Sequence, residues 1–298
     1  MTDGLRRAFG QPAPLASITQ EAFDYDDAHL HRLVRLKPGE RAVPGDLLDY
    51  AHDLRYTEID KPLLTFLLPF CLEAWRDDLR GTTTSYGAFV EYFYPVLADC
   101  HLFDAVLNPQ QTAAISAYMR QSILEEMDDQ RGLAYQGMTA RPYRWIRALT
   151  THGVVLADVE SLWTEWWMVE TIGRAVSIVQ YASVLMYPDN KNPIFAPWTH
   201  AGGGGPPCLW DFAGHLYSHR WLDANVEFLQ GALTASKVAD VLELAVKRLA
   251  DEPEYEIAAR VLGELWGRAD MVEARCLELP KLLATTQEAG FLLEWAKR

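Results

Sequence analysis

The chain of 298 residues has only four cysteines and no apolar run of membrane-spanning length. The cysteines are separated by 29, 108 and 68 residues, which matches no paired spacing of a zinc or redox site. We therefore expect reduced thiols and a cytoplasmic protein. The longest uncharged stretches are too short for a bilayer or are interrupted by prolines and glycines, so no membrane association is expected. The cysteines are Cys71, Cys100, Cys208 and Cys276.

Basic residues are also scarce. The chain has 27 lysines and arginines and 41 aspartates and glutamates, which gives a net charge of −14. Residues 1–150 hold 15 basic and 21 acidic side chains (−6), and residues 151–298 hold 12 and 20 (−8). Neither half is a basic module, which argues against nucleic-acid binding. The acidic excess serves either solubility or the attraction of a basic partner. Arginine outnumbers lysine by 20 to 7, a usage common in bacteria with GC-rich genomes.

Recognisable catalytic motifs are missing as well. There is no G-x-S-x-G nucleophile elbow. The glycine run 202–205 is followed by Pro206 and Pro207, which lack the amide donors that a phosphate-binding loop needs. These absences favour a protein that is not an enzyme.

Helical periodicity is what the sequence does contain. Asn108 and Gln111 have the spacing of a capping box, and apolar residues at 115, 119, 123 and 127 follow at every fourth position. Other helices are expected over 60–80, 85–107, 158–187, 210–231, 236–250, 254–266 and from 271 onward. Internal Pro69 and Pro95 should kink or divide two of them. Because no strand-like alternation is sustained, we predict an all-α, multi-helix globular bundle of about nine to eleven helices with one long Pro/Gly-rich loop.

The expected organisation is a loosely ordered N-terminal arm over 1–40, a helical half over 41–133, a connecting segment over 134–156 and a second helical half over 157–298. The two halves are expected either to form separate domains or to share one core. Residues 175–187 are apolar almost all round, which predicts a central core helix. The neighbouring Trp166 and Trp167 point about 100° apart on a helix. Burial of this helix on several sides is favoured, with an interface as the alternative.

The long loop suggests a binding site for a small ligand. Residues 188–209 have little helical character, and structureless connections of this length are usually functional or disordered. Order is expected in its first part, because Ile194, Phe195 and Trp198 would gain by burial. Phe195, Trp198 and Trp210 are predicted to line a pocket gated by the 190–210 loop.

A histidine spacing after this loop suggests a metal site. Asp211, His215 and His219 are four residues apart, which places them on one helix face, and His200 could supply a fourth ligand for zinc or iron. The glutamate of the metalloprotease motif is missing, because Leu216 follows His215. The alternative is structural: Asp211 caps a helix and the histidines contact neighbouring helices. Our first expectation is that the chain binds no cofactor.

An acidic cluster near a predicted helix end is the candidate partner-binding surface, and its members are Glu125, Glu126, Asp128 and Asp129. Like charges at this spacing near a helix C-terminus are mildly unfavourable, which suggests a basic partner or an ion. The alternative is an ordinary solvated surface.

Three functions follow, in order of preference. The first is a cytoplasmic bacterial interaction protein, immunity- or adaptor-like, that binds a basic partner through its acidic surface or forms a homo-oligomer. The second is a metal-dependent hydrolase built on the Asp/His site. The third is a helical protein that binds a small ligand under the 190–210 loop.

Overall fold

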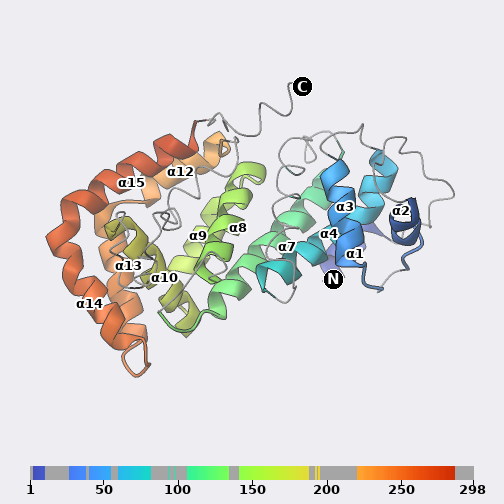
Figure 1. Cartoon of the computed structure of the whole chain (residues 1–298). Helices are drawn as coiled ribbons and strands as arrows, with labels where there is room; N and C mark the ends of the chain where they lie inside the picture. The colour runs from blue at the N-terminus through green and yellow to red at the C-terminus, as the bar shows by residue number, and fades with distance from the viewer. Residues whose placement is uncertain are drawn as a thin grey trace, which may run out of the picture. The chain divides into compact units, whose positions relative to one another are not determined.

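A computed structural model describes residues 3–10, 27–37, 40–54, 60–81, 93, 97, 106–133, 141–187, 192, 194 and 220–285. Within these ranges every regular element is a helix and no strand occurs, which confirms the all-α prediction (Figure 1). No helix in this part of the chain is long and apolar enough to cross a membrane.

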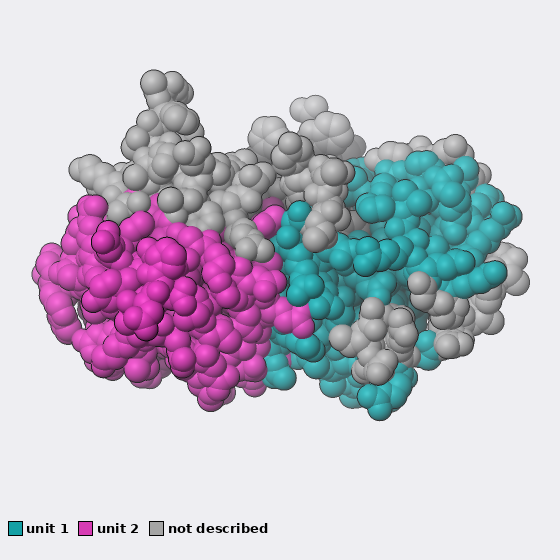
Figure 2. Space-filling model, turned by 90° about the horizontal axis from the view of Figure 1, so that it is seen from below, with its two compact units in different colours: residues 1–122 teal, residues 123–298 magenta. Residues whose placement is uncertain are grey.

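The chain groups into two compact units, residues 1–122 and 123–298 (Figure 2). The division falls inside helix α7 (Pro109–Asp128), not in the predicted connecting segment. That segment, 134–156, contains helix α8 (Arg141–Val155) of the second unit. The predicted N-terminal arm contains two short helices, α1 (Asp3–Phe9) and α2 (Asp27–Leu33).

The first unit packs α2 against α3 (Pro44–Asp53), and both α1 and α3 against α4 (Lys61–Leu79). The Asp60 side chain caps α4 by accepting the Leu63 amide at 3.0 Å. The helix then continues through Pro69, so the expected division at this proline does not occur. Between α2 and α3, Arg32 donates to both carboxylate oxygens of Asp46 at 2.7 and 2.8 Å.

Helix α7 begins as its capping box predicts. Asn108 Oδ1 accepts the Gln111 amide at 2.9 Å, and Gln111 Oε1 accepts the Asn108 amide at 3.1 Å. Beyond the end of the helix, Gly132 adopts a φ of 77°, a conformation in which a side chain would be strained.

The predicted helix 158–187 is two helices, α9 (Val159–Trp167) and α10 (Ile172–Met186). The chain leaves the helical path at Val169, whose φ is 54°. Thr171 then caps α10 by accepting the Arg174 amide at 3.1 Å. The prediction of a single continuous helix was therefore wrong, because the Thr171 cap and a tertiary contact begin a new helix here.

Helix α10 is the core of the second unit, as predicted, since every residue from 173 to 186 is buried. It packs against α9, α13 (Ala235–Arg248), α14 (Tyr255–Leu265) and α15 (Ala269–Leu283) (Figure 1). The polar side chains of α10 form hydrogen bonds inside the core. Ser177 accepts Trp166 Nε1 at 2.8 Å, and Gln180 accepts Trp145 Nε1 at 3.1 Å.

Burial was the favoured expectation for the tryptophan-rich helix, and the structure confirms it for Trp163 and Trp166, while Trp167 is half-buried. The ring centroids of Trp163 and Trp166 lie 5.1 Å apart in an edge-on arrangement. Trp145 and Tyr181 extend the cluster, with centroids 5.3 Å from that of Trp166. Such contacts stabilise the packing beyond the burial of area.

The C-terminal helices form where the periodicity predicts them, although α12 (Asp223–Ala232) covers only the second half of the predicted 210–231 helix among the described residues. Asn225 joins α12 to the turn between α8 and α9. Its Nδ2 donates to the carbonyls of Gly153 and Leu156 at 2.9 and 2.7 Å, and its Oδ1 accepts the Val159 amide at 3.3 Å. A 3-10 helix, η2 (Trp266–Arg268), links α14 to α15.

Candidate partner-binding surface

The predicted metal ligands and the predicted ligand-pocket residues lie outside the described residues. This applies to His200, Asp211, His215 and His219 and to Phe195, Trp198 and Trp210. Among the residues that the structure does describe, no three His, Cys, Asp or Glu side chains come together as metal ligands.

Two described residues of the long loop test the expectation of order in its first part. Ile194 is fully buried, and Asn192 Nδ2 donates to Ser183 Oγ of α10 at 3.0 Å. Asn192 Oδ1 accepts the Ile194 amide at 2.9 Å. The loop therefore contacts the core helix at Asn192 and is buried at Ile194, as the burial argument predicted for Ile194.

The four acidic residues of the predicted cluster do not share one surface. Glu126 has no exposed area and accepts Gln130 Nε2 at 3.0 Å, so it was wrongly assigned to an exposed face. Asp129 is exposed, and Glu125 and Asp128 are half-buried. The α-helical spacing explains the division, because residues one position apart point about 100° away from each other.

Glu126 instead begins a chain of buried hydrogen bonds. Gln130 bonds to Glu126 through its Nε2 and accepts Gln180 Nε2 at 3.3 Å. Gln180 in turn accepts the indole N–H of Trp145. This chain joins the end of α7 to α8 and α10 and gives Glu126 a structural role.

Asp128 contributes to a different arrangement, centred on Arg174 in the first turn of α10. The Arg174 side chain is only 7% exposed. Its Nε and Nη2 donate to the two carboxylate oxygens of Asp128 at 2.9 and 3.2 Å, and its Nη1 donates to the Glu165 carbonyl at 2.9 Å. The carboxylates of Glu165 and Glu170 lie 3.5 and 3.7 Å from the same guanidinium. One buried cation thus orients three carboxylates.

The turn between α9 and α10 presents an apolar side chain among these acids. Met168 is 58% exposed, although the residues on either side of it in the chain, Trp167 and Val169, are partly or fully buried. The backbone of Val169 has a φ of 54°, and a β-branched residue adopts this conformation only at a cost. Arg248 Nε donates to the Val169 carbonyl at 3.2 Å and holds the turn in place.

We call this region the Arg174 junction. It consists of the end of α7, the last turn of α9, the α9–α10 turn and the first turn of α10. Arg131, which donates to the Asp128 carbonyl at 2.9 Å, and Arg248 also belong to it. Three carboxylates, those of Asp128, Glu165 and Glu170, surround the single Arg174 guanidinium, and Met168 is exposed in the turn between Glu165 and Glu170.

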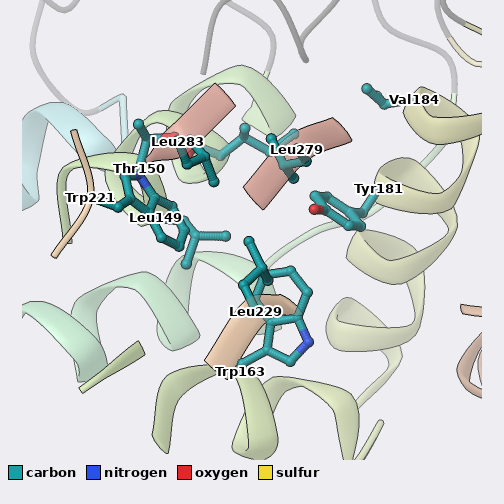
Figure 3. A pocket seen from close by; sticks show the side chains of 10 residues that line it. Leu149, Thr150, Trp163, Tyr181, Val184, Trp221, Leu229, Leu279 and Leu283 are labelled. Atoms are coloured by element: carbon teal, nitrogen blue, oxygen red, sulfur yellow. The ribbon is translucent and has the colours of Figure 1, made fainter. Parts of the chain in front are cut away.

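The described part of the second unit also contains an apolar cavity of about 30 Å³ (Figure 3). Trp163, Tyr181 and Trp221 line it with aliphatic side chains from α8, α10, α12 and α15, and Thr150 adds a hydroxyl. Clefts that bind drug-sized ligands measure about 300–1,000 Å³. A cavity with about the volume of one water molecule is a packing defect on that scale.

Sequence reasoning missed Glu165, Met168, Glu170 and Arg174. A usable signal exists for Arg174, because it is the only charged residue in the stretch 171–187. A charge in a helix that is otherwise buried needs a carboxylate partner, so its presence predicts acids nearby. The partners themselves come from α7, from the last turn of α9 and from the α9–α10 turn, which only the tertiary structure brings together.

Comparison of the chain with protein-family models, with curated proteins and with solved structures finds no match.

Proposed function

We propose that this chain is a protein-interaction protein that binds a basic segment of a partner protein at the Arg174 junction. The observation that carries the proposal is the exposed Met168 between carboxylates that a buried arginine holds in place. The proposed setting is the bacterial cytoplasm, and the proposed role is immunity- or adaptor-like.

The chemistry of the junction suits a lysine or arginine side chain. The alkyl stem of such a side chain packs on a methionine, while its charged head reaches a carboxylate. Glu165 and Glu170 flank Met168 in the sequence, and their side chains are 46% and 65% exposed. Because Arg174 restricts both carboxylates before the partner arrives, less conformational entropy is lost on binding.

The conformation of Val169 supports the same proposal. A residue held in a sparsely populated backbone region costs about 1–3 kcal/mol, and such strain concentrates at binding sites. Here the strained turn puts Val169 inside and Met168 outside. Glycine would adopt the turn at lower cost but would leave the buried position of Val169 empty.

Neutralising the two exposed glutamates tests the proposal. In Glu165→Gln/Glu170→Gln the volume is kept and the Arg174–Asp128 pair remains, so the fold should be unaffected. At roughly 50 mM salt, we expect the variant to capture less basic protein from an extract of the source cells than the parent does. At roughly 500 mM salt, where charges are screened, we expect no difference between variant and parent. The captured proteins are identified and quantified by mass spectrometry.

The matched control is Asp240→Asn/Glu243→Gln on α13. Both control residues are exposed, and the substitution changes the net charge by the same two units. If the control weakens capture as much as the junction variant does, overall charge is responsible and the junction is not the site. Met168→Ala provides a second check, because it should weaken capture without any change of charge.

The metal-dependent hydrolase remains a prediction from the sequence. Native mass spectrometry of protein purified without chelators tests it, with His215→Ala/His219→Ala as the comparison. A stoichiometric metal that disappears in this variant would favour the hydrolase over the interaction protein.

A further inference from the structure

The methionines of the described part of the chain differ sharply in exposure. Met119, Met127 and Met186 have no exposed area, whereas Met271 is 38% and Met168 is 58% exposed. Oxidation of a thioether requires that the oxidant reach the sulfur atom, so it follows exposure. Met168 is therefore the described methionine that is most accessible to an oxidant, and it lies in the Arg174 junction.

The α9–α10 turn fixes the exposure of Met168. The next side chain, Val169, is only 3% exposed. The Val169 amide donates to the Trp166 carbonyl at 3.3 Å, and Arg248 Nε donates to the Val169 carbonyl at 3.2 Å. Because the backbone is bonded in the conformation that places Val169 inside, Met168 cannot turn inward in its place.

The charged groups nearest to Met168 in the chain are carboxylates, and ionised carboxylates only accept hydrogen bonds. Glu165 and Glu170 are held 3.5 and 3.7 Å from the Arg174 guanidinium. That guanidinium already donates to both carboxylate oxygens of Asp128 and to the Glu165 carbonyl. A sulfoxide oxygen at Met168 would be a strong acceptor that carboxylates cannot satisfy, so it would hold water instead.

We propose that Met168 is an oxidation site and that its conversion to the sulfoxide by hydrogen peroxide weakens the binding of a basic segment at the Arg174 junction. The inference rests on the proposed function and names a regulation of the same site. In the oxidation, the Met168 sulfur attacks one oxygen of the peroxide and the O–O bond breaks. A new S–O bond forms, the sulfur is oxidised by two electrons, and the other oxygen leaves as water after taking up the proton of the first. Methionine sulfoxide reductase with a thiol reductant reverses the step.

The effect on binding follows from the change in the methionine surface. The alkyl stem of a lysine packs on the thioether, whereas a hydrated sulfoxide must first lose its water. The carboxylates of Glu165 and Glu170 are unchanged, so the electrostatic attraction remains. We therefore expect oxidation to raise the dissociation constant by roughly a factor of ten and to leave its salt dependence as it was.

Peptide mapping by mass spectrometry during treatment of the folded full chain with hydrogen peroxide measures the order of oxidation. Met168 should be oxidised at least about ten times faster than Met119, Met127 and Met186, which the fold shields from the oxidant. Oxidation of Met168 at the rate of these buried methionines would overturn the proposal.

Fluorescence anisotropy of labelled hexalysine, at low salt, measures the effect on binding. The parent should bind this probe more weakly after peroxide treatment and regain its affinity after treatment with the reductase and thiol, but not with thiol alone. Met168→Leu cannot form a sulfoxide, so whatever its own affinity, peroxide should not change it. Met271→Leu is the matched control, because it removes the other exposed methionine of the described residues and should respond to peroxide as the parent does.

The Glu165→Gln/Glu170→Gln variant separates a failure of this inference from a failure of the proposed function. If this variant binds hexalysine as tightly as the parent, the junction is not the binding site and the proposed function is refuted. If it binds more weakly but oxidised parent binds like reduced parent, or if Met168→Leu also loses affinity in peroxide, the junction stands and the regulation by Met168 is overturned.

Discussion

Gly173 sits where the first turn of α10 crosses the end of α7, and its replacement by alanine tests the packing of the second unit. A Cβ at this position would lie 2.0 Å from the Asp128 carbonyl oxygen and 2.5 Å from that of Met127. Both contacts are with backbone, so no side-chain rotation can relieve them. The two helix ends would have to separate by about an ångström.

That separation would lengthen the hydrogen bonds between Asp128 and Arg174 and would also disturb the packing of the two helices. Overpacking of a core costs about 1–3 kcal/mol, and occasionally more when backbone must move. Alanine gains back about 1 kcal/mol of helix propensity over glycine. Since the contact is far closer than van der Waals distance and also strains the Asp128–Arg174 pair, we expect a net loss of about 2 kcal/mol. The melting temperature should fall by about 4–8 °C.

Urea unfolding followed by tryptophan fluorescence measures the change, because Trp145, Trp163, Trp166 and Trp221 all lie in the second unit. The matched control is Gly263→Ala in α14, where a Cβ meets nothing within 4 Å. The control should gain about 0.4–1 kcal/mol, because alanine restricts the unfolded chain. If Gly173→Ala were as stable as the parent or the control, the close crossing of α7 and α10 would be refuted.

Three further predictions concern buried and paired groups. Asn225→Ala leaves three backbone groups without their partner and should lower the free energy of unfolding by about 2–4 kcal/mol in urea, and a loss under about 1 kcal/mol would contradict the bonding described. Burial raises the pKa of Cys276 to about 12 and raises that of Cys71, so peptide mapping after iodoacetamide treatment at pH 8 should find both unmodified in folded protein, and rapid modification would disprove their burial. The hydrogen bond from Tyr187 lowers the pKa of Glu264, so this contribution to stability is present above the ordinary pKa of 4.5 and is lost as the pH falls through the folded value. The stability difference between the parent and Tyr187→Phe should accordingly shrink in acid, and a difference constant from pH 7 to pH 3 would rule this linkage out.

The candidate site could be predicted only in part. Asp128 was singled out as a member of an acidic cluster, and it does lie at the Arg174 junction, but one of the four cluster residues is not on the surface. Glu126, two positions earlier, is inside the protein and bonds to Gln130. Sequence spacing says that two side chains differ in direction, but it does not say which direction is covered by another helix.

The α9–α10 turn shows a similar limit. Hydrophobic periodicity runs through 158–187 without interruption, and the local signals for a break at Val169 are weak. The restart of the helix at Thr171 depends on Asp128, which accepts the Thr171 hydroxyl at 2.5 Å and binds Arg174. Asp128 is more than 40 positions away in the sequence, so a window of neighbouring residues cannot contain the cause.

Local sequence by itself determined the helical class, the capping box that begins α7, the apolar character of α10 and the acidity of the chain. Helix formation depends on residues within a few positions of each other, and net charge depends on composition alone, so both can be read without a fold. The tertiary structure alone decided which acids are exposed, where the 158–187 helix breaks and why, among the described tryptophans, Trp266 is exposed while five others are buried. Burial is set by contacts between distant segments, and no local pattern specifies which partner covers a given face.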